Sequence, residues 1–240
     1  MTYNIWFDNK DRISRLESLI AVISINNPDI ICIQEAVPDI YELLKLKLEE
    51  YKHHFPKVLD RAYGSVILSK IPFIDTNKYE FETSKMGRYL LTVTIKHEKL
   101  LITIGNSHFE SEFSKKYNKE KMKQYTTSEQ ILDKKYNVSK DVIFASDTNI
   151  QFHEEDKFFC KKEWKDSWIE KGNNKDKYTF DYYTNKNLKS KSIGKFRSRL
   201  DRILYRSDGM NCINYKLIKG VIGLIQPSDH HGVLVTFAVK

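Results

Sequence analysis

Two short motifs carry residue types that suit metal-assisted chemistry at a phosphate group. Ser228-Asp229-His230 sets a carboxylate beside an imidazole, and Asp147-Thr148-Asn149 sets a carboxylate two residues from an amide. A few oxygen donors of this kind bind a hard cation and leave room for water and a substrate phosphate. A neighbouring carboxylate holds a histidine cationic near neutral pH, and Asp201 is the candidate partner for His230. The motifs therefore predict a site that combines cation binding with charge stabilisation.

Glu35 and the segment His108-Phe109-Glu110-Ser111 add further candidate groups. Glu35 follows a short apolar run, and both His108 and Ser111 can donate hydrogen bonds to a phosphate oxygen. Each candidate also has an ordinary structural explanation. Glu35 could lie in a solvated loop, the Asp147 motif could form a turn that caps a helix, and Ser111 could cap the helix that follows it.

The hydrophobic pattern indicates which elements would position these groups. Apolar residues at helical spacing predict helices over 12–25 and 39–50, and a long charged stretch predicts another at about 116–135. Alternation of helices with apolar runs is typical of an α/β fold with helices packed on sheets. The predicted strands cover 30–33, 65–69, 89–95, 100–104, 141–145, 202–205, 215–219 and 233–239.

The polar candidates lie where the predicted strands stop. Ligand sites in α/β folds cluster at strand ends, so five such ends could converge on one cleft. The sequence thus predicts a single site built from side chains that are far apart along the chain. The residues at these ends are Asn4, Glu35, His108, Asp147, Asn149, Asp229 and His230.

Charge and cysteine content bear on the partner and the compartment. Forty Lys and Arg against 32 Asp and Glu give a formal charge of +8, which favours a polyanionic partner. Eight of the basic residues fall within 186–206, a run that either attracts backbone phosphates or forms a solvated loop. The three cysteines, Cys32, Cys160 and Cys212, are widely spaced. This spacing indicates no disulfide framework, no cysteine-based zinc site and a reducing, intracellular compartment.

The chain shows no sign of internal division or of a membrane segment. It has no internal repeat, no linker rich in Pro, Gly or Ser, and no apolar stretch of membrane-spanning length. Its first residues also lack the basic and apolar regions of a signal peptide. We therefore expect one domain over residues 1–240 and no contact with a membrane.

Six motifs, taken in order, resemble the endonuclease/exonuclease/phosphatase superfamily of DNase I-like, metal-dependent phosphoesterases. Any one of them is weak, but the ordered set is specific and spans nearly the whole chain. The resemblance implies a four-layer α/β sandwich in which two packed mixed β-sheets are flanked by helices. The motifs are Thr2-Tyr3-Asn4, Ile33-Gln34-Glu35, Ser107-His108, Ser146-Asp147-Thr148-Asn149, Leu200-Asp201-Arg202 and Ser228-Asp229-His230.

Finer details resemble the subfamily that removes tyrosyl groups from 5′ DNA ends. Met86-Gly87-Arg88 ahead of a strand, Thr148 inside its motif, and Tyr178-Thr179-Phe180-Asp181 all fit that subfamily. The resemblance implies Mg²⁺-dependent hydrolysis of the phosphodiester between a protein tyrosine, as in a topoisomerase adduct, and a DNA 5′ end. The product would be a 5′-phosphate, and the role would be DNA repair. Some relatives act instead on a tyrosyl link to RNA.

The same resemblance implies roles for the site residues. Glu35 and Asp229 would bind Mg²⁺, with Mn²⁺ as a substitute and Asn4 nearby. Asp147 would activate the attacking water, and Asn149 would orient the phosphate.

The remaining roles concern the phosphate and the nucleic acid. His230, supported by Asp201, would stabilise charge on the phosphate oxygens. The residues implied in phosphate or DNA contact are His108, Ser111, Arg88, Phe180 and Leu200.

Three positions depart from the pattern of the subfamily, and at one of them Phe113 stands where a basic residue is expected. His231 stands where an aromatic residue is usual, and Gln151 stands where an arginine is expected to bind phosphate. These departures affect the expected DNA contacts rather than the metal chemistry. The expected partners are single-stranded or frayed DNA 5′ ends carrying a tyrosyl adduct, with RNA as an alternative. We expect a monomer, and in a eukaryote a nuclear location.

Other functions remain open at the level of sequence. A different nuclease of the same superfamily, such as an apurinic-site endonuclease or a deadenylase, would use the same metal and phosphate residues. A lipid phosphodiesterase is a further relative, but no apolar loop suited to membrane insertion is evident. A non-catalytic nucleic-acid-binding module would also suit the basic charge, although it would not need the complete set of carboxylates.

Overall fold

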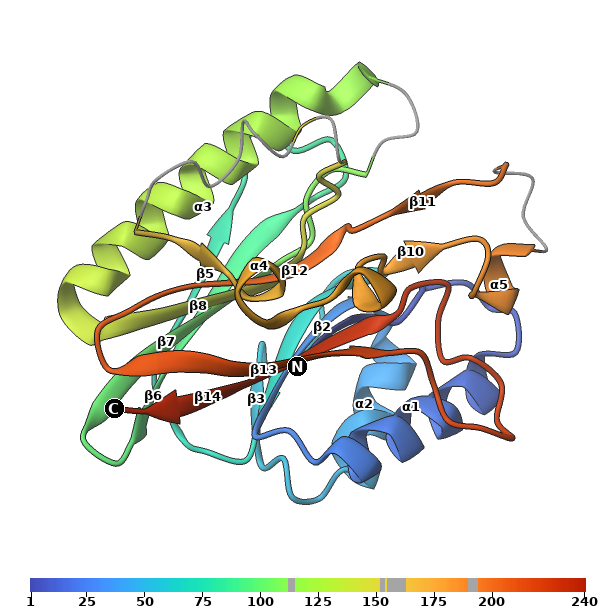
Figure 1. The fold of residues 1–240 in the computed structure, drawn as a ribbon, viewed down its shortest axis with the longest axis horizontal. Helices are drawn as coiled ribbons and strands as arrows, with labels where there is room; N and C mark the ends of the chain where they lie inside the picture. The colour runs from blue at the N-terminus through green and yellow to red at the C-terminus, as the bar shows by residue number, and fades with distance from the viewer. Residues whose placement is uncertain (112–114, 152–153, 155–162, 190–193) are drawn as a thin grey trace.

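In the computed structural model, two six-stranded β-sheets pack face to face and helices cover their outer faces (Figure 1). The structure describes residues 1–111, 115–151, 154, 163–189 and 194–240. Within these residues the first sheet has the order β13-β14-β1-β2-β4-β3 and the second the order β5-β6-β7-β8-β12-β9. Strands β1 and β2 run parallel, as do β7 and β8, while the other neighbouring strands are antiparallel. Both sheets are therefore mixed.

The strands and helices are distributed along the whole chain. The first sheet consists of β1 (Thr2–Asn4), β2 (Ile30–Ala36), β3 (His53–Phe55), β4 (Gly64–Ser69), β13 (Met210–Ile218) and β14 (Gly232–Val239). The second consists of β5 (Phe73–Glu80), β6 (Tyr89–His97), β7 (Leu100–Ser107), β8 (Lys140–Asp147), β9 (Lys165–Asp166) and β12 (Asp201–Ser207). A short ribbon joins β10 (Phe180–Asp181) to β11 (Arg197–Ser198). The helices are α1 (Arg12–Asn26), α2 (Pro38–Lys47), α3 (Asn118–Ser139), α4 (Ser167–Lys171) and α5 (Lys186–Lys189).

Three hydrophobic clusters lie between the four layers. Helices α1 and α2 pack on the first sheet through a cluster that includes Val22 and Ile33. The two sheets pack on each other through a cluster that includes Ile67 and Leu91, and α3 packs on the second sheet through Leu132. The resulting order of helices, sheet, sheet and helix confirms the predicted four-layer α/β sandwich. None of the described helices is both long and apolar enough to cross a membrane.

The structure corrects several predicted boundaries. Helix α2 ends at Lys47 instead of residue 50, and α3 begins at Asn118 with Tyr117 as its cap. Ser111 is therefore not the N-cap of that helix. Strand β5 was not predicted from the sequence, because it is an edge strand and most of its exposed positions carry polar residues. Strands β7 and β8 continue to the polar residues that follow their apolar runs, so those residues remain inside the sheet.

A buried pair of amides joins the two sheets. Asn106 of β7 is fully buried, and its Nδ2 donates to the carbonyl oxygens of Ile33 (3.0 Å) and Val66 (2.9 Å) in the opposite sheet. Gln34 completes the link, because its Nε2 donates to Asn106 Oδ1 (2.7 Å) and to Thr2 Oγ1 (2.9 Å). Every one of these groups would be costly to leave unpaired away from water. The pair therefore fixes how the sheets lie relative to each other directly beside Glu35.

Replacing Asn106 by alanine should lower the free energy of unfolding by about 3 kcal/mol, because it removes the hydrogen bonds that Asn106 makes to two buried carbonyls and to one N–H of the Gln34 amide. Urea denaturation followed by circular dichroism measures the change. Asn211 is an exposed strand asparagine, so Asn211→Ala is the matched control and should change stability by less than about 0.5 kcal/mol. Equal losses in the two variants would contradict the structural role of Asn106.

Candidate active site

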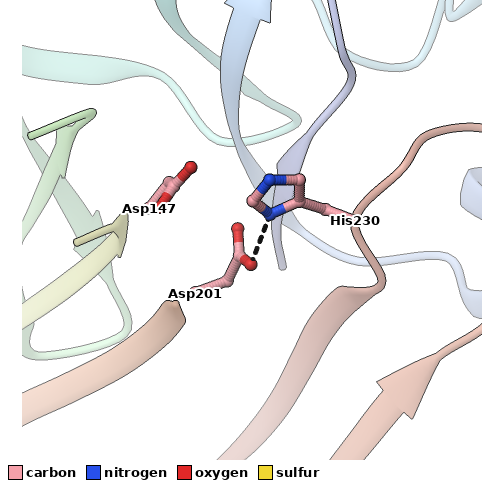
Figure 2. Close-up of side chains that lie close together, drawn as sticks. All are labelled: Asp147, Asp201 and His230. Atoms are coloured by element: carbon pink, nitrogen blue, oxygen red, sulfur yellow. Dashed lines mark hydrogen bonds and ion pairs between the residues drawn. The ribbon is translucent and has the colours of Figure 1, made fainter. Parts of the chain in front are cut away.

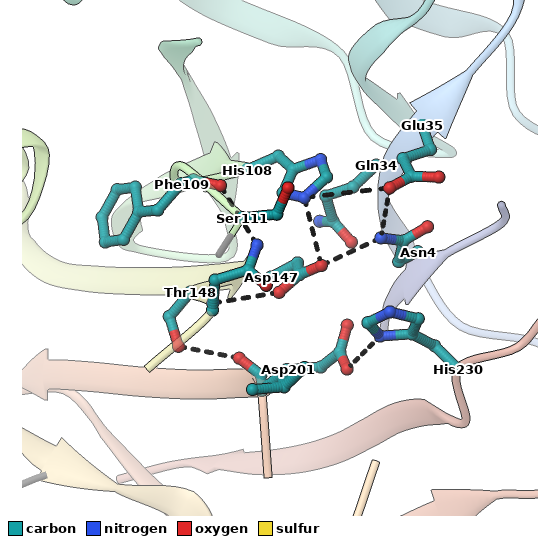
Figure 3. A network of polar contacts seen from close by, with 12 residues as sticks. Asn4, Gln34, Glu35, His108, Phe109, Ser111, Asp147, Thr148, Asp201 and His230 are labelled. Atoms are coloured by element: carbon teal, nitrogen blue, oxygen red, sulfur yellow. Dashed lines mark hydrogen bonds and ion pairs between the residues drawn. The ribbon is translucent and has the colours of Figure 1, made fainter. Parts of the chain in front are cut away.

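Asn4 connects residues from both sheets at the end of β1. Its Nδ2 donates to Glu35 Oε1 (3.2 Å) in the first sheet and to Asp147 Oδ2 (2.9 Å) in the second (Figure 3). Its Oδ1 accepts from the backbone N–H of Trp6 at 3.0 Å. The orientation of the amide is thereby fixed, and the two carboxylates are held on either side of it.

Glu35 lies in an irregular part of β2. Its φ angle is 59°, in the left-handed region, and the register of β2 against β4 shifts at this point. Glu35 Oε2 accepts from the backbone N–H of Phe7 at 3.0 Å. Burial raises the pKa of Glu35, and the nearby carboxylate of Asp229 raises that pKa further. Such strained conformations occur where a side chain must be aimed at a site.

The Asp147 motif forms a turn at the end of β8. The backbone N–H of Asn149 donates to Asp147 Oδ1 at 3.1 Å, so the motif forms the kind of turn that was its structural alternative. Both the N–H and the hydroxyl of Thr148 donate to the carbonyl of Leu200, and Asn149 Nδ2 donates to the carbonyl of Phe109 at 3.1 Å. The turn leaves Asp147 Oδ2 directed at Asn4 (Figure 3). Burial and the charge of Asp201 raise the pKa of Asp147 to about 7.

His230 and Asp201 form a buried ion pair. His230 Nδ1 lies 2.8 Å from Asp201 Oδ2 (Figure 2). The ring is held at its backbone, because the N–H of His230 donates to Ser228 Oγ. Burial by itself lowers the pKa of His230, but the carboxylates of Asp201, Asp147 and Asp229 outweigh it and raise the pKa to about 10. His230 is therefore an imidazolium at neutral pH.

Two groups of side chains could hold a cation. Ligand atoms of Asp147, Asp201 and His230 all lie within 4.8 Å of one another. That set suits a proton-holding cluster better than a metal, because His230 carries protons on both nitrogens when it is charged and has no lone pair to donate. Glu35 and Asp229 offer only oxygen donors, which Mg²⁺ prefers. A bound dication would relieve the repulsion between these two carboxylates. The Glu35–Asp229 pair therefore fits a hard cation better than the other group does.

His108 faces the same cluster from the end of β7. Its Nε2 lies 3.3 Å from Asp147 Oδ2 and 3.9 Å from Glu35 Oε1. Its Nδ1 lies 2.7 Å from a guanidinium nitrogen of Arg88. Burial lowers the pKa of His108 well below its ordinary value, and the Arg88 charge lowers it further. Ser111 is half-buried, and its hydroxyl contacts the sulfur of Met86 at 3.4 Å.

Phe180, Leu200 and His231 form one wall of the site. The ring of Phe180 meets that of His230 edge to face at 5.0 Å, and Phe180 and Leu200 share a small apolar cluster. His231 has a structural environment that the sequence did not reveal. Its N–H donates to the carbonyl of Thr179, and its Nε2 lies 2.9 Å from Thr184 Oγ1. Burial lowers the pKa of His231 to about 4, so it joins this wall as a neutral side chain.

The structure also shows support residues that the sequence did not mark. Lys121 of α3 is buried, and its Nζ donates to Glu154 Oε2 (2.8 Å) and to the carbonyl of Asn149 (3.1 Å). Glu154 in turn accepts from the backbone N–H of Gln151 at 2.9 Å. This pair holds the chain that follows Asp147. No sequence signal distinguishes Lys121 from the other lysines of its helix, since only packing decides which one is buried.

Half of the basic residues in the run 186–206 form ion pairs within the protein. Lys191 lies outside the described residues, but four arginines of the run each pair with an aspartate. The arginine charges are therefore engaged internally, while Lys186, Lys189 and Lys195 are exposed. The pairs are Arg197–Asp181, Arg199–Asp166, Arg202–Asp166 and Arg206–Asp133. Cys32 and Cys212 are free thiols, while Cys160 lies outside the described residues.

Comparison with known proteins places this geometry in a family. Residues 1–230 match the model of the Endonuclease/Exonuclease/phosphatase family. The chain belongs to that family. Curated relatives include Bos taurus "Tyrosyl-DNA phosphodiesterase 2", 30% identical over 100% of this chain and 67% of the relative, and Caenorhabditis elegans "5'-tyrosyl-DNA phosphodiesterase", 27% identical over 99% and 66%. The chain thus spans about two thirds of these relatives, and the predicted subfamily is confirmed.

Solved structures agree on the fold. The chain superposes on Danio rerio tyrosyl-DNA phosphodiesterase 2 in complex with a single-stranded DNA product with a TM-score of 0.85, 24% identity, and coverage of 99% of this chain and 97% of that one. A mannosyl-6-phosphatase from Bacteroides thetaiotaomicron gives a TM-score of 0.77 at 15% identity, covering 99% and 98%. The architecture is therefore shared by proteins named for different phosphoesters, so the fold by itself does not choose the substrate.

Lys121→Met should lower the free energy of unfolding by about 3–5 kcal/mol, because it leaves the carboxylate of Glu154 buried without its counter-charge. Chemical denaturation measures the loss. The exposed Lys123 on the same helix provides the control variant Lys123→Met, which should be near neutral. Adding Glu154→Gln to Lys121→Met removes the unpaired charge and should restore part of the stability. A double variant no more stable than Lys121→Met would contradict this account.

Proposed function

We propose that this chain hydrolyses the phosphodiester between a protein tyrosine and a DNA 5′ end, leaves a 5′-phosphate, and acts in DNA repair. One observation carries the proposal. The chain is similar throughout its length to proteins named tyrosyl-DNA phosphodiesterase 2, and its strand ends bring together the carboxylates, amide and histidines that such hydrolysis needs. The proposed cofactor is Mg²⁺, with Mn²⁺ as a substitute.

The leaving group sets the demands on the site. The phenol of tyrosine has a pKa near ~10, so it departs more readily than a sugar alkoxide. Glu35 and Asp229 would hold Mg²⁺, which when bound supplies Lewis-acid stabilisation of the charge that develops on the leaving oxygen. A strong general acid is then unnecessary. The protein must still activate a water molecule and stabilise the charge on the other phosphate oxygens.

Asp147 is the proposed base that positions and activates the water. Its pKa is raised to about 7 by burial and by Asp201, which brings it close to the working range of a general base. Asn4 holds one of its oxygens at 2.9 Å and thereby fixes the direction of the carboxylate. Asn149, bonded back to Asp147 and Phe109, would orient the phosphate from the adjoining turn.

Two histidines in different charge states would stabilise the phosphate. His230, kept charged by Asp201, offers an imidazolium N–H, whereas His108 offers a neutral ring. Fixed donors in a site that excludes water stabilise developing charge without reorganising. Ser111 would add a hydroxyl donor, and Phe180 and Leu200 would form an apolar wall against the terminal nucleotide.

The proposed substrate is a single-stranded or frayed 5′ end, with RNA as a second nucleic acid to be tested. We propose that the protein acts as a monomer in a reducing, intracellular compartment, nuclear in a eukaryote. The free thiols of Cys32 and Cys212 accord with the reducing compartment.

Asp147→Ala and His230→Ala should each lower the rate of cleavage of a 5′-phosphotyrosyl oligonucleotide by about 10²–10³, because each removes one pre-aimed catalytic group. Single-turnover assays measure the rate, and thermal melting checks that folding is retained. His97 is an exposed histidine at the far end of β6, so His97→Ala is the control and should cleave normally. Cleavage by Asp147→Ala at the wild-type rate would reject the assignment of the base.

Substrate and metal dependence separate this function from its rivals. Cleavage of the 5′-tyrosyl oligonucleotide should require Mg²⁺, stop with EDTA, and recover with Mn²⁺. Oligonucleotides with a 3′-tyrosyl group, an abasic site or a poly(A) tail should be cleaved at least 10-fold more slowly. Preference for the abasic or poly(A) substrate would identify a different nuclease of the family. Binding of DNA without EDTA-sensitive cleavage would identify a non-catalytic module.

A further inference from the structure

The contact between Arg88 and His108 determines where the imidazole carries its proton. Both side chains are buried, with 6% and 3% of their surfaces exposed, and His108 Nδ1 lies 2.7 Å from an Arg88 guanidinium nitrogen. A guanidinium has only donors. His108 Nδ1 must therefore be the acceptor, which leaves the ring proton on Nε2. That nitrogen faces Asp147 Oδ2 at 3.3 Å.

The segment that carries His108 also holds Arg88 in place. Glu110 is fully buried, and its Oε1 accepts from Ser84 Oγ (2.6 Å) and from the backbone N–H of Lys85 (2.7 Å). Ser84 Oγ in turn accepts from the backbone N–H of Arg88 at 2.7 Å. Glu110 follows His108 by two residues. One short segment therefore carries both the His108 ring and the carboxylate that holds the loop of Arg88.

We propose that Arg88 is a positioning residue that locks His108 in the neutral tautomer with its proton on Nε2. The reaction part of this inference rests on the proposed function, because the Nε2–H group is the donor that would meet the phosphate. The opposite tautomer would direct a lone pair at Asp147 and at the phosphate oxygens, and both contacts would become repulsive. The 2.7 Å contact of the guanidinium with His108 Nδ1 assigns Arg88 this role.

Long-range ¹H–¹⁵N spectra of the labelled protein, without substrate, read the tautomer directly. The resonances of His108 are assigned by their loss in His108→Gln. The wild type should show a protonated Nε2 and an unprotonated Nδ1. Arg88→Met, which removes the donor, should shift His108 toward the other tautomer, and Arg88→Lys, which keeps a donor-only cation, should retain the wild-type form. A wild-type ring protonated on Nδ1 would overturn the proposal, whether or not Arg88→Met folds.

Kinetics on the 5′-tyrosyl oligonucleotide test the consequence. Arg88→Met should lower kcat by about 10²-fold, the loss of one aimed donor, and leave KM within a few-fold. Lys85→Met is the matched control, since it removes one charge from an exposed side chain of the same loop and should leave kcat unchanged. A raised KM in Arg88→Met, together with a loss of about one unit in the slope of log affinity against log salt concentration, would instead indicate direct phosphate contact. That result would overturn the positioning role.

The two kinds of measurement keep the two hypotheses apart. If the wild type does not cleave the 5′-tyrosyl oligonucleotide, the proposed function fails, yet the spectra still decide the tautomer. If the wild type cleaves it and the spectrum of Arg88→Met equals that of the wild type, the proposed function stands and the tautomer lock is rejected.

Discussion

Four carboxylates withdrawn from water in one place impose the main constraint on this molecule. Glu35, Asp147, Asp201 and Asp229 come from four separated parts of the chain, and burial raises the pKa of the first two. Burying a charge is costly unless it is paired or hydrogen-bonded. The protein meets this cost with the His230 imidazolium and with neutral donors, among them the Asn4 amide. The strand ends that carry these carboxylates must therefore be held in fixed positions relative to one another.

The scaffold that enforces this meeting lies directly behind the site. Asn106 and Gln34 bridge the two sheets with buried amides, and the irregular backbone at Glu35 aims the carboxylate outward from β2. On the other side, the Lys121–Glu154 pair holds the chain after Asp147. Polar networks of this kind stabilise a structure only when every member has a partner. Accordingly, the buried amides of Asn106 and Gln34 and the Lys121–Glu154 pair have hydrogen-bond partners.

The two histidines show how position alone differentiates identical side chains. His230 sits among carboxylates and is charged, whereas His108 sits against a guanidinium and is neutral. Their proposed work is complementary, because one supplies charge and the other supplies a directed hydrogen bond. His231, one residue beyond His230, is turned into the wall and bonded to Thr184. Adjacent residues in the sequence thus have unrelated environments in the fold.

The sequence alone determined the order of the chemical groups and the layered α/β architecture. Motifs such as Asp147-Thr148-Asn149 and Ser228-Asp229-His230 are local, and buried strands are marked by continuous apolar runs. Edge strand β5 and the beginning of α3 were not predicted correctly, because exposed positions and helix ends carry weak patterns. Only the tertiary structure decided which charged residues are buried and which partner each one faces. Lys121 and Glu110 look ordinary in sequence, and the motif that marks Arg88 does not reveal its contact with His108. These contacts join segments that the chain brings together only on folding.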